Sequence, residues 1–517
     1  MIRNFKFIAL LLILLSIPSV IGLLQSGFPL TDDGNWMVIR FSAFYESLRD
    51  GQLPVRFLMR LNNGYGYPVA DFLYPLFMYF ATPLHILGLS FVESIKAVLA
   101  LSLVFSSLFT FLWLRKFFDN LSSFVGSLIY VYLPYHLLDV YKRGSVGEAL
   151  SLSVLPFVLW QIEKGSLFLS SIGISLLILS HNSLAVLFLG LIVIYMGLNI
   201  YVSSKRKNLI YKNLGILGFG FAMSSFFWIP AVFDLQYTVF TQTKISEYSS
   251  YFANEKLVGV VSILVILLTI LFIFTKKLNI TKHRLTIVML IVSLVSIFFA
   301  TPFSAALWNM LPVTFIQFPF RFLSLTLISI SFQAAAVTSV LDKKTKVVVA
   351  VLLLGLTYYF SLPFAKVYQS QNYPDTFYST NQDTTTVKNE YMPKWVKNIP
   401  AQMYKAKVEN TTGIEPINLI SNTPNKTGFE VDLNSPKIIR VNTVYFPGWS
   451  AYVNGQRVNI DYLKDGLINL NLNEGKNSVL VIFGETNVRI LSDIISVASL
   501  GMLILLTFYF RKRRIWI

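Results

Sequence analysis

Two adjacent carboxylates, Asp32 and Asp33, follow the first apolar segment of the chain. Paired carboxylates just outside a membrane span can act as a general base, as ligands of a divalent cation, or as both. Basic side chains in the same loop, such as Arg56, are of the kind that binds a phosphate group. A structural alternative stays open, in which Asp32 or Asp33 caps the helix expected from about Asn35 to Asp50.

Three later turns also carry polar side chains at the ends of apolar segments. Arg143 precedes Glu148, which opens a segment where a carboxylate also favours the positive end of the helix dipole. His181 and Asn182 separate two further segments, and Arg321 begins another. A cation such as Arg321 on the outer side opposes the usual charge distribution of membrane proteins, and an anionic lipid headgroup would explain its place. Together these residues predict acid–base chemistry combined with phosphate binding.

The aromatic run Gly64–Pro68 closes the same first loop. It lacks the lysine and the strand-to-helix context of a phosphate-binding loop, so we expect a tight turn. Tyr65 and Tyr67 are candidates for positioning a substrate. Cysteine is absent, which excludes thiolate chemistry and disulfides. No cofactor is predicted with certainty, no metal ligands are assigned, and a divalent cation at the carboxylates is compatible with the sequence.

The elements that hold these residues are predicted to be membrane-spanning helices. The 517 residues are 54% hydrophobic and only 13% charged, whereas soluble domains carry roughly 25% charge. Stretches such as Phe7–Leu24 and Val186–Val202 contain no charge and can cross a hydrocarbon core of about 30 Å. We therefore expect an all-α polytopic membrane protein with about twelve spans, near 7–24, 93–114, 121–139, 147–163, 166–180, 183–203, 210–231, 256–275, 285–302, 320–340, 345–363 and 489–510.

The net charge of +17 follows the topology rather than indicating nucleic acid. Basic clusters lie at alternate span ends, which predicts a cytoplasmic basic side and both termini inside. The segment Phe72–Ser90 contains Pro75 and Pro83 and many aromatic residues, so we place it at the outer interface. The prediction is a multi-pass protein of the plasma (inner) membrane, surrounded by membrane lipids, with its functional face outside. The main basic clusters are Lys205–Lys207, Lys276-Lys277, Lys343-Lys344 and Arg511–Arg514.

A polar domain of different character is predicted between the last two spans. Its second half alternates as strands do, and Asn454-Gly455 and Asp465-Gly466 separate the runs. Such dipeptides favour hairpin turns because they accept a positive φ. We therefore divide the chain into a membrane module (1–364, with the outer loop 25–92), a β-rich outer domain (365–487), and a last span with a basic tail (488–517).

Short polar and aromatic pieces occur in a fixed order along most of the chain: Asp50–Arg56, Gly64–Pro68, Arg143-Gly144 with Glu148, His181-Asn182, Phe318–Arg321, Glu390–Pro393 and Pro447–Trp449. With the acidic first loop and the outer C-terminal domain, this order resembles the GT-C superfamily of polytopic glycosyltransferases. More closely, the chain resembles the bacterial membrane family labelled "6-pyruvoyl-tetrahydropterin synthase-related". The family pattern has a histidine shortly after the first-loop aspartate, where this sequence has Trp36.

The resemblance implies transfer of a hexose or pentose from a polyprenyl-phosphate donor to a glycan, lipid or protein acceptor at the outer face. Asp32 or Asp33 would act on the acceptor hydroxyl, with Glu148 as a second carboxylate. Arg143, Arg321 and Arg56 would bind the donor phosphate, and Tyr65, Tyr67, His181 and Asn182 would position the substrates. Pterin chemistry is not implied, because that enzyme needs a zinc site of three histidines. This chain has four scattered ones: His85, His136, His181 and His283.

Two other functions stay open on the sequence alone. One is a flippase or transporter of lipid-linked glycans, although the spans lack the midplane charges that ion-coupled transporters usually carry. The other is a non-catalytic envelope protein whose β domain binds a glycan.

Overall fold

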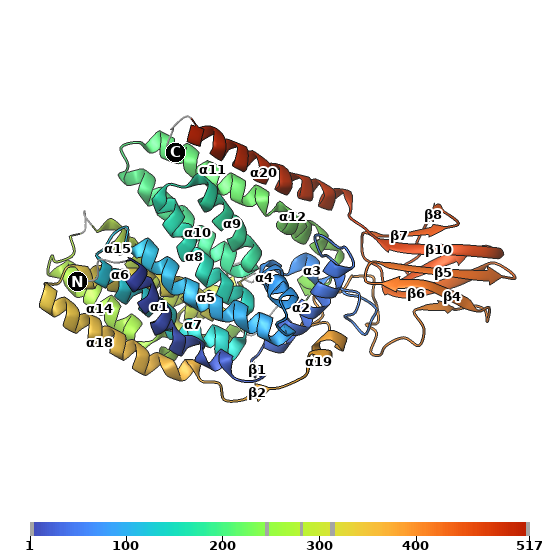
Figure 1. Cartoon of the computed structure of the whole chain (residues 1–517), viewed down its shortest axis with the longest axis horizontal. Coiled ribbons are helices and arrows are strands. Elements are labelled where there is room, and N and C mark those ends of the chain that lie inside the picture. The colour runs from blue at the N-terminus through green and yellow to red at the C-terminus, as the bar shows by residue number, and fades with distance from the viewer. Residues whose placement is uncertain (1–4, 243–247, 280–282, 311–315, 513–517) are drawn as a thin grey trace.

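The computed structural model describes residues 5–242, 248–279, 283–310 and 316–512. A helical module makes up most of the chain, and a β domain extends from one end of it (Figure 1). The terminal residues Arg513 and Arg514, and Lys282, which belong to predicted basic clusters, lie outside the described residues. The long helices are α1 (Phe5–Val20), α5 (Phe91–Leu114), α8 (Val146–Lys164), α9 (Leu167–Ser180), α10 (Asn182–Val202), α11 (Arg206–Met223), α14 (Val260–Phe274), α15 (Arg284–Ala300), α17 (Leu323–Ser339), α18 (Lys343–Ser361) and α20 (Asn487–Lys512).

The prediction of a mostly helical, apolar membrane module is confirmed, whereas the number of twelve spans stays a prediction. Seven helices of the described chain are long and apolar enough to cross a membrane, or up to ten if each bent pair forms one span. The helices α9 and α14 are apolar but shorter than a full span. The segment assigned to the outer interface contains only α4 (Leu76–Ile86), which is also short.

Three pairs of helices are bent by more than 40° at a short break, although the apolar run continues through each pair in the sequence. One pair consists of α6 (Asn120–Tyr132) and α7 (Pro134–Leu138), bent by 42°. Pro134 has no backbone N–H and disfavours a helical conformation at Leu133, whose ψ is 140°. A single π-helical turn, η2 (Asp139–Arg143), then ends the pair at Gly144. The helices α6, α7 and η2 thus follow one another, and η2 ends with Arg143 directly before the turn that leads into α8.

The long first loop is held by chain that follows α18. Strand β1 (Phe28–Pro29) pairs with β2 (Ser370–Gln371), and α19 (Asp375–Thr380) packs on α2 (Gly34–Arg49). The buried Arg40 donates from its guanidinium Nη2 to the carbonyl oxygen of Thr385 at 2.6 Å. These contacts fix the start of α2, and with it the two adjacent aspartates.

A β-sheet region near the C-terminus is confirmed, and eight strands lie within residues 408–483, whereas the boundaries 365–487 stay a prediction. A five-stranded antiparallel sheet has the order β4-β5-β10-β7-β8, and a three-stranded sheet has the order β3-β6-β9. Asn454 and Gly455 take φ values of 50° and 81° in the turn between β7 and β8, as a tight hairpin requires. The strands are β3 (Val408–Asn410), β4 (Ile417–Thr423), β5 (Lys426–Leu433), β6 (Lys437–Val444), β7 (Trp449–Val453), β8 (Gln456–Val458), β9 (Leu467–Leu472) and β10 (Gly475–Phe483).

Candidate functional site

The first loop and the turn after η2 meet through their backbones. The amide of Asp32 donates to the Lys142 carbonyl at 2.9 Å, and the amide of Asp33 donates to the Arg143 carbonyl at 2.8 Å. Gly144 has φ +66°, and a Cβ there would lie 2.4 Å from Thr31 Oγ1. Since only glycine fits this left-handed position without strain, the sequence itself permits the close approach of the two segments.

Glu148 lies at the centre of a buried group of charges. Its Oε1 accepts hydrogen bonds from the guanidiniums of Arg143 and Arg321, the latter at 2.9 Å, and Tyr135 donates its hydroxyl to Oε2 at 2.9 Å. Asp139 Oδ1 accepts from Arg143 Nη1 at 3.0 Å. All five side chains are buried. Removing either partner of such a buried ion pair would leave an unpaired charge in the protein interior and lower the free energy of unfolding.

Aromatic rings cover the two arginines. The Arg143 guanidinium lies 5.5 Å from the centre of the Phe318 ring and 5.1 Å from that of Phe320. Arg321 lies 4.8 Å from the Phe318 ring, and its Nη1 donates to the Ile316 carbonyl and to Gln317 Oε1, both at 2.8 Å. These contacts hold the planes of both guanidiniums in place and limit their access to water.

His181 closes the group from the start of α10. Its Nδ1 accepts from the amide of Leu184 at 3.3 Å, which caps the helix and places the ring proton on Nε2. That Nε2 lies 3.6 Å from Glu148 Oε1. Tyr74 packs against the ring with centroids 4.6 Å apart. The His181 ring is therefore neutral, and its Nε2 lies beside Glu148 just beyond hydrogen-bond distance.

The two adjacent aspartates have different surroundings. Asp32 is exposed and pairs with Lys142 at 2.7 Å, whereas Asp33 lies 3.6 Å from Arg143 with its side chain 30% exposed. Burial raises the pKa of the Asp33 carboxyl, and the Arg143 guanidinium only partly opposes this rise. Neither is seen to cap α2 with its side chain; Thr31 Oγ1 instead accepts from the Gly34 amide at 3.0 Å. Asp33 is thus the half-accessible carboxylate of the group.

Arg56 belongs to a second buried network, away from Glu148. It pairs with Asp493 at 3.1 Å and with Glu485 at 3.3 Å, and lies 3.6 Å from Asp71. Asp71 and Asp234 both pair with Arg489, at 3.4 and 2.8 Å. This network joins the first loop, α12 (Ser225–Asp234), the end of β10 and α20.

The remaining candidate residues lie outside this group of charges, and the side-chain polar groups of Tyr67 and Asn182 are hydrogen-bonded elsewhere. The Tyr67 hydroxyl accepts from the Tyr391 amide at 3.0 Å and is bonded to Thr386, in a fully buried position. Tyr65 packs edge-on against Tyr404 beside the β domain. Asn182 donates to the Phe72 carbonyl at 2.9 Å. The structure thus brings together Asp33, Arg143, Glu148, His181 and Arg321, and places the other candidates outside their contacts.

Sequence reasoning missed Asp139, Tyr135 and Tyr74. Asp139 lies at the end of an apolar run, where it looked like the limit of a span. Tyr135 lay inside that predicted span, and Tyr74 lay in the aromatic segment assigned to the outer interface. A signal did exist for Asp139, which stands four residues before Arg143 and pairs with it across one helical turn.

The described residues contain no group of three or more His, Cys, Asp or Glu side chains arranged to hold a metal ion. The carboxylates around Glu148 face guanidiniums instead.

A family described as "6-pyruvoyl-tetrahydropterin synthase related domain; membrane protein" matches residues 72–367. An uncharacterised protein of Lactococcus lactis subsp. cremoris (strain MG1363) is 22% identical over 268 residues, which cover 48% of this chain and 43% of the relative. The alignment thus spans less than half the length of that relative.

Two solved structures show partial similarity. A mycobacterial arabinofuranosyltransferase, AftD, aligns with TM-score 0.47 and 14% identity, over 70% of this chain and 27% of its own. The oligosaccharyltransferase AglB of the archaeon Archaeoglobus fulgidus, in complex with an inhibitory peptide and a dolichol-phosphate, aligns with TM-score 0.46 and 13% identity, over 76% and 57%. Scores below 0.5 do not establish a shared fold.

Proposed function

This chain belongs to the family of 6-pyruvoyl-tetrahydropterin synthase related membrane proteins, and we propose that it is a membrane glycosyltransferase. It would transfer a sugar from a polyprenyl-phosphate donor to a glycan, lipid or protein acceptor at the outer face. The observation that carries the proposal is Asp33, a half-accessible carboxylate beside a buried group of two guanidiniums.

Asp33 takes the role of general base in this proposal. Its raised pKa makes it a better proton acceptor than an exposed aspartate, while its exposed edge can reach an acceptor hydroxyl. Asp32 is turned toward Lys142 and does not share this environment. We therefore assign the acceptor proton to Asp33.

Arg143 and Arg321 supply positive potential where the donor phosphate gains charge as the glycosidic bond breaks. Glu148 and the aromatic rings hold both guanidiniums before substrate arrives, so little reorganisation is needed during the reaction. Glu148 acts in this scheme by positioning the cations, and His181 packs beside it with its Nε2 3.6 Å from Glu148 Oε1. Arg56 and Tyr67 have no part in it, because their polar groups are engaged elsewhere. Tyr65 has none because it packs against Tyr404 beside the β domain.

The distribution of basic residues indicates how the protein is oriented in the membrane. The basic clusters at the start of α11 and α18 lie at the opposite helix ends from the first loop. By the positive-inside rule those ends are cytoplasmic, and Asp33 and the β domain are extracytoplasmic. The β domain, joined to the first loop by the Arg489 network, would orient the acceptor.

The test is release of polyprenyl phosphate from polyprenyl-phosphate hexoses and pentoses by the purified protein in proteoliposomes, followed by mass spectrometry. We expect Asp33→Asn to lower the rate about 10²- to 10⁴-fold, and Asp32→Asn, its matched control, to retain activity within a few fold. Full activity of the Asp33→Asn protein would remove the assigned base. Absence of release from every donor by the wild-type protein, with or without cell-envelope acceptors, would contradict the glycosyltransferase assignment.

A further inference from the structure

Lys407 is a buried lysine at the junction between the first loop and the β domain. Its side chain is only 6% exposed, and it directly precedes β3. Its Nζ donates to the Asn442 carbonyl on β6 at 2.8 Å and to the Gly64 carbonyl in the first loop at 3.3 Å. The third contact is Met59 Sδ, also in the first loop, at 3.4 Å. The ammonium group of Lys407 thus bridges the two parts of the molecule.

No carboxylate compensates the charge of Lys407 within the part of the chain that the structure describes. The Tyr404 ring lies 5.0 Å from its Nζ. Glu409 on β3 and Arg440 on β6 influence the hydroxyl of Tyr65, but burial alone acts on Lys407. Burial without a counter-charge disfavours the charged form of a lysine. It lowers the pKa of Lys407 to about 7, so the amine titrates near neutral pH.

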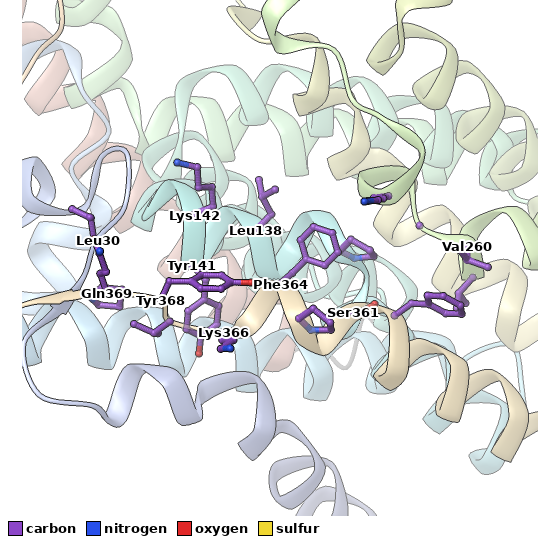
Figure 2. A pocket seen from close by; sticks show the side chains of 18 residues that line it. Leu30, Leu138, Tyr141, Lys142, Val260, Ser361, Phe364, Lys366, Tyr368 and Gln369 are labelled. Atoms are coloured by element: carbon purple, nitrogen blue, oxygen red, sulfur yellow. The ribbon is translucent and has the colours of Figure 1, made fainter.

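A cavity of about 680 Å³ in the membrane module does not reach Lys407 (Figure 2). It lies between α7, α14 and η9 (Leu362–Ala365), and its lining includes neither a strand of the β domain nor the turn at Gly64. Lys142, which does line it, is 67% exposed and pairs with Asp32 at 2.7 Å. Among the described residues, Lys407 has neither the exposure of Lys142 nor its carboxylate partner.

The contacts of Lys407 lie next to a backbone hydrogen bond that joins the first loop to β6. The Val444 amide donates to the Tyr65 carbonyl at 2.7 Å. Tyr65 follows Gly64, and Val444 stands two positions after Asn442, so this bond and the two carbonyl contacts of Lys407 are neighbours. An opening of the junction that breaks the bond at Val444 therefore separates Gly64 from β6 and hydrates the Lys407 amine.

We propose that Lys407 is a pH-sensitive pin, which holds the β domain loosely on the first loop while its amine is charged and firmly once the amine is neutral. In the open junction the hydrated amine has the ordinary lysine pKa of about 10.4, whereas in the closed junction the pKa is about 7. Between these values closing releases a proton, so the closed junction gains up to about tenfold per pH unit as the pH rises.

The direction of the effect is set by the same two states. Below about pH 7 the amine is charged in both, so further acidification adds nothing and the closed junction bears the full cost of burying the charge. Alkaline conditions favour the closed junction. The pin does not depend on the transfer chemistry proposed for Asp33.

The test is hydrogen exchange of the Val444 amide in the full-length protein in nanodiscs, measured by mass spectrometry from about pH 6 to 9. Protection, corrected for the intrinsic exchange rate at each pH, should rise in the wild type by up to about tenfold per unit above about pH 7. Lys407→Met keeps a side chain of similar length without a titratable group, so its protection should change less than about twofold. The matched control is Lys405→Met, two positions away and exposed, which should respond as the wild type does.

A flat wild-type profile, or the same rise in Lys407→Met as in the wild type, overturns the inference. If Lys407→Met fails to fold, Lys407→Gln provides the same comparison with a neutral polar side chain, and the wild-type profile can still refute the pin by itself. Asp33→Asn should show the wild-type exchange profile. Failure of the proposed transfer chemistry therefore leaves the exchange result unaffected, and a flat exchange profile leaves the role of Asp33 unaffected.

Discussion

Replacing Glu148 by Gln tests the electrostatic centre of the molecule. Glutamine keeps the size of the side chain and can still accept the Tyr135 hydroxyl, but it removes the charge that Arg143 and Arg321 share. Breaking a buried ion pair from one side costs about 3–5 kcal/mol. Arg143 keeps its ion pair with Asp139 at 3.0 Å, so the unpaired cation in the variant is mainly Arg321. We therefore expect the free energy of unfolding to fall by about 3 kcal/mol.

The assay is thermal unfolding of the purified protein in detergent, with Glu163→Gln as the matched control. Glu163 accepts from Tyr195 and from Asn199 and forms no ion pair among the described residues, so its replacement should cost about 1 kcal/mol. The apparent melting temperature of the Glu148 variant should therefore fall clearly further than that of the control. Equal shifts would refute the argument that Glu148 balances two buried cations.

A double variant sharpens the same prediction. Arg321→Gln alone leaves Glu148 with Arg143 as its remaining guanidinium partner, and Glu148→Gln alone leaves Arg321 without a carboxylate. With both changes, the Arg143–Asp139 pair remains and no guanidinium is left unpaired. The double variant should therefore be less destabilised than the sum of the single variants, by about 0.5–3 kcal/mol. Strict additivity would show that the two side chains are not coupled.

Three further predictions concern other parts of the framework. Transfer activity should fall with decreasing pH as Asp33 becomes protonated, over a range above that of an ordinary aspartate because its pKa is raised; in Asp33→Asn this acid limb of the pH–rate profile should vanish. Gly144→Ala should lower the melting temperature, because its φ of +66° and the approach of Thr31 exclude a methyl group, whereas Gly190→Ala, with open space around it, should not. Arg489→Leu should cost about 3–5 kcal/mol by leaving buried carboxylates unpaired and should expose the β domain to limited proteolysis, whereas the exposed Arg457→Leu should do neither.

The membrane module was predictable because its physical requirement is simple. About 20 apolar residues are needed to cross the hydrocarbon core, and such runs are visible in a single sequence. The bends were harder to predict, since a break such as that at Leu133 and Pro134 leaves the apolar run uninterrupted. In the β domain, the Asn454-Gly455 turn revealed its hairpin, whereas the strands before Lys437 were not predicted. In one of them, β4, every side chain is exposed or half-buried, so no apolar face marks the strand.

The candidate site was only partly predictable, for a different reason. Residue types pointed to Asp32, Asp33, Glu148, Arg143 and Arg321 as a set, but the sequence did not distinguish the two aspartates. Their difference arises from contacts between segments more than 100 positions apart, which pair one aspartate with a lysine and the other with an arginine. Asp139 was missed because it was taken as the limit of a span, although its partner Arg143 stands four residues later.

The structure contains two networks of buried charges, one around Glu148 and one around Arg56 and Arg489, and their surroundings indicate different roles. The network of Arg489 and Arg56 ties four distant segments together, so its charges are needed to hold the last helix and the β domain in place. The network of Glu148 joins the ends of helices that already pack through apolar side chains, and it adjoins the half-exposed carboxylate of Asp33. The proposed chemistry at Asp33 gives these charges a role that the apolar packing of the helices does not.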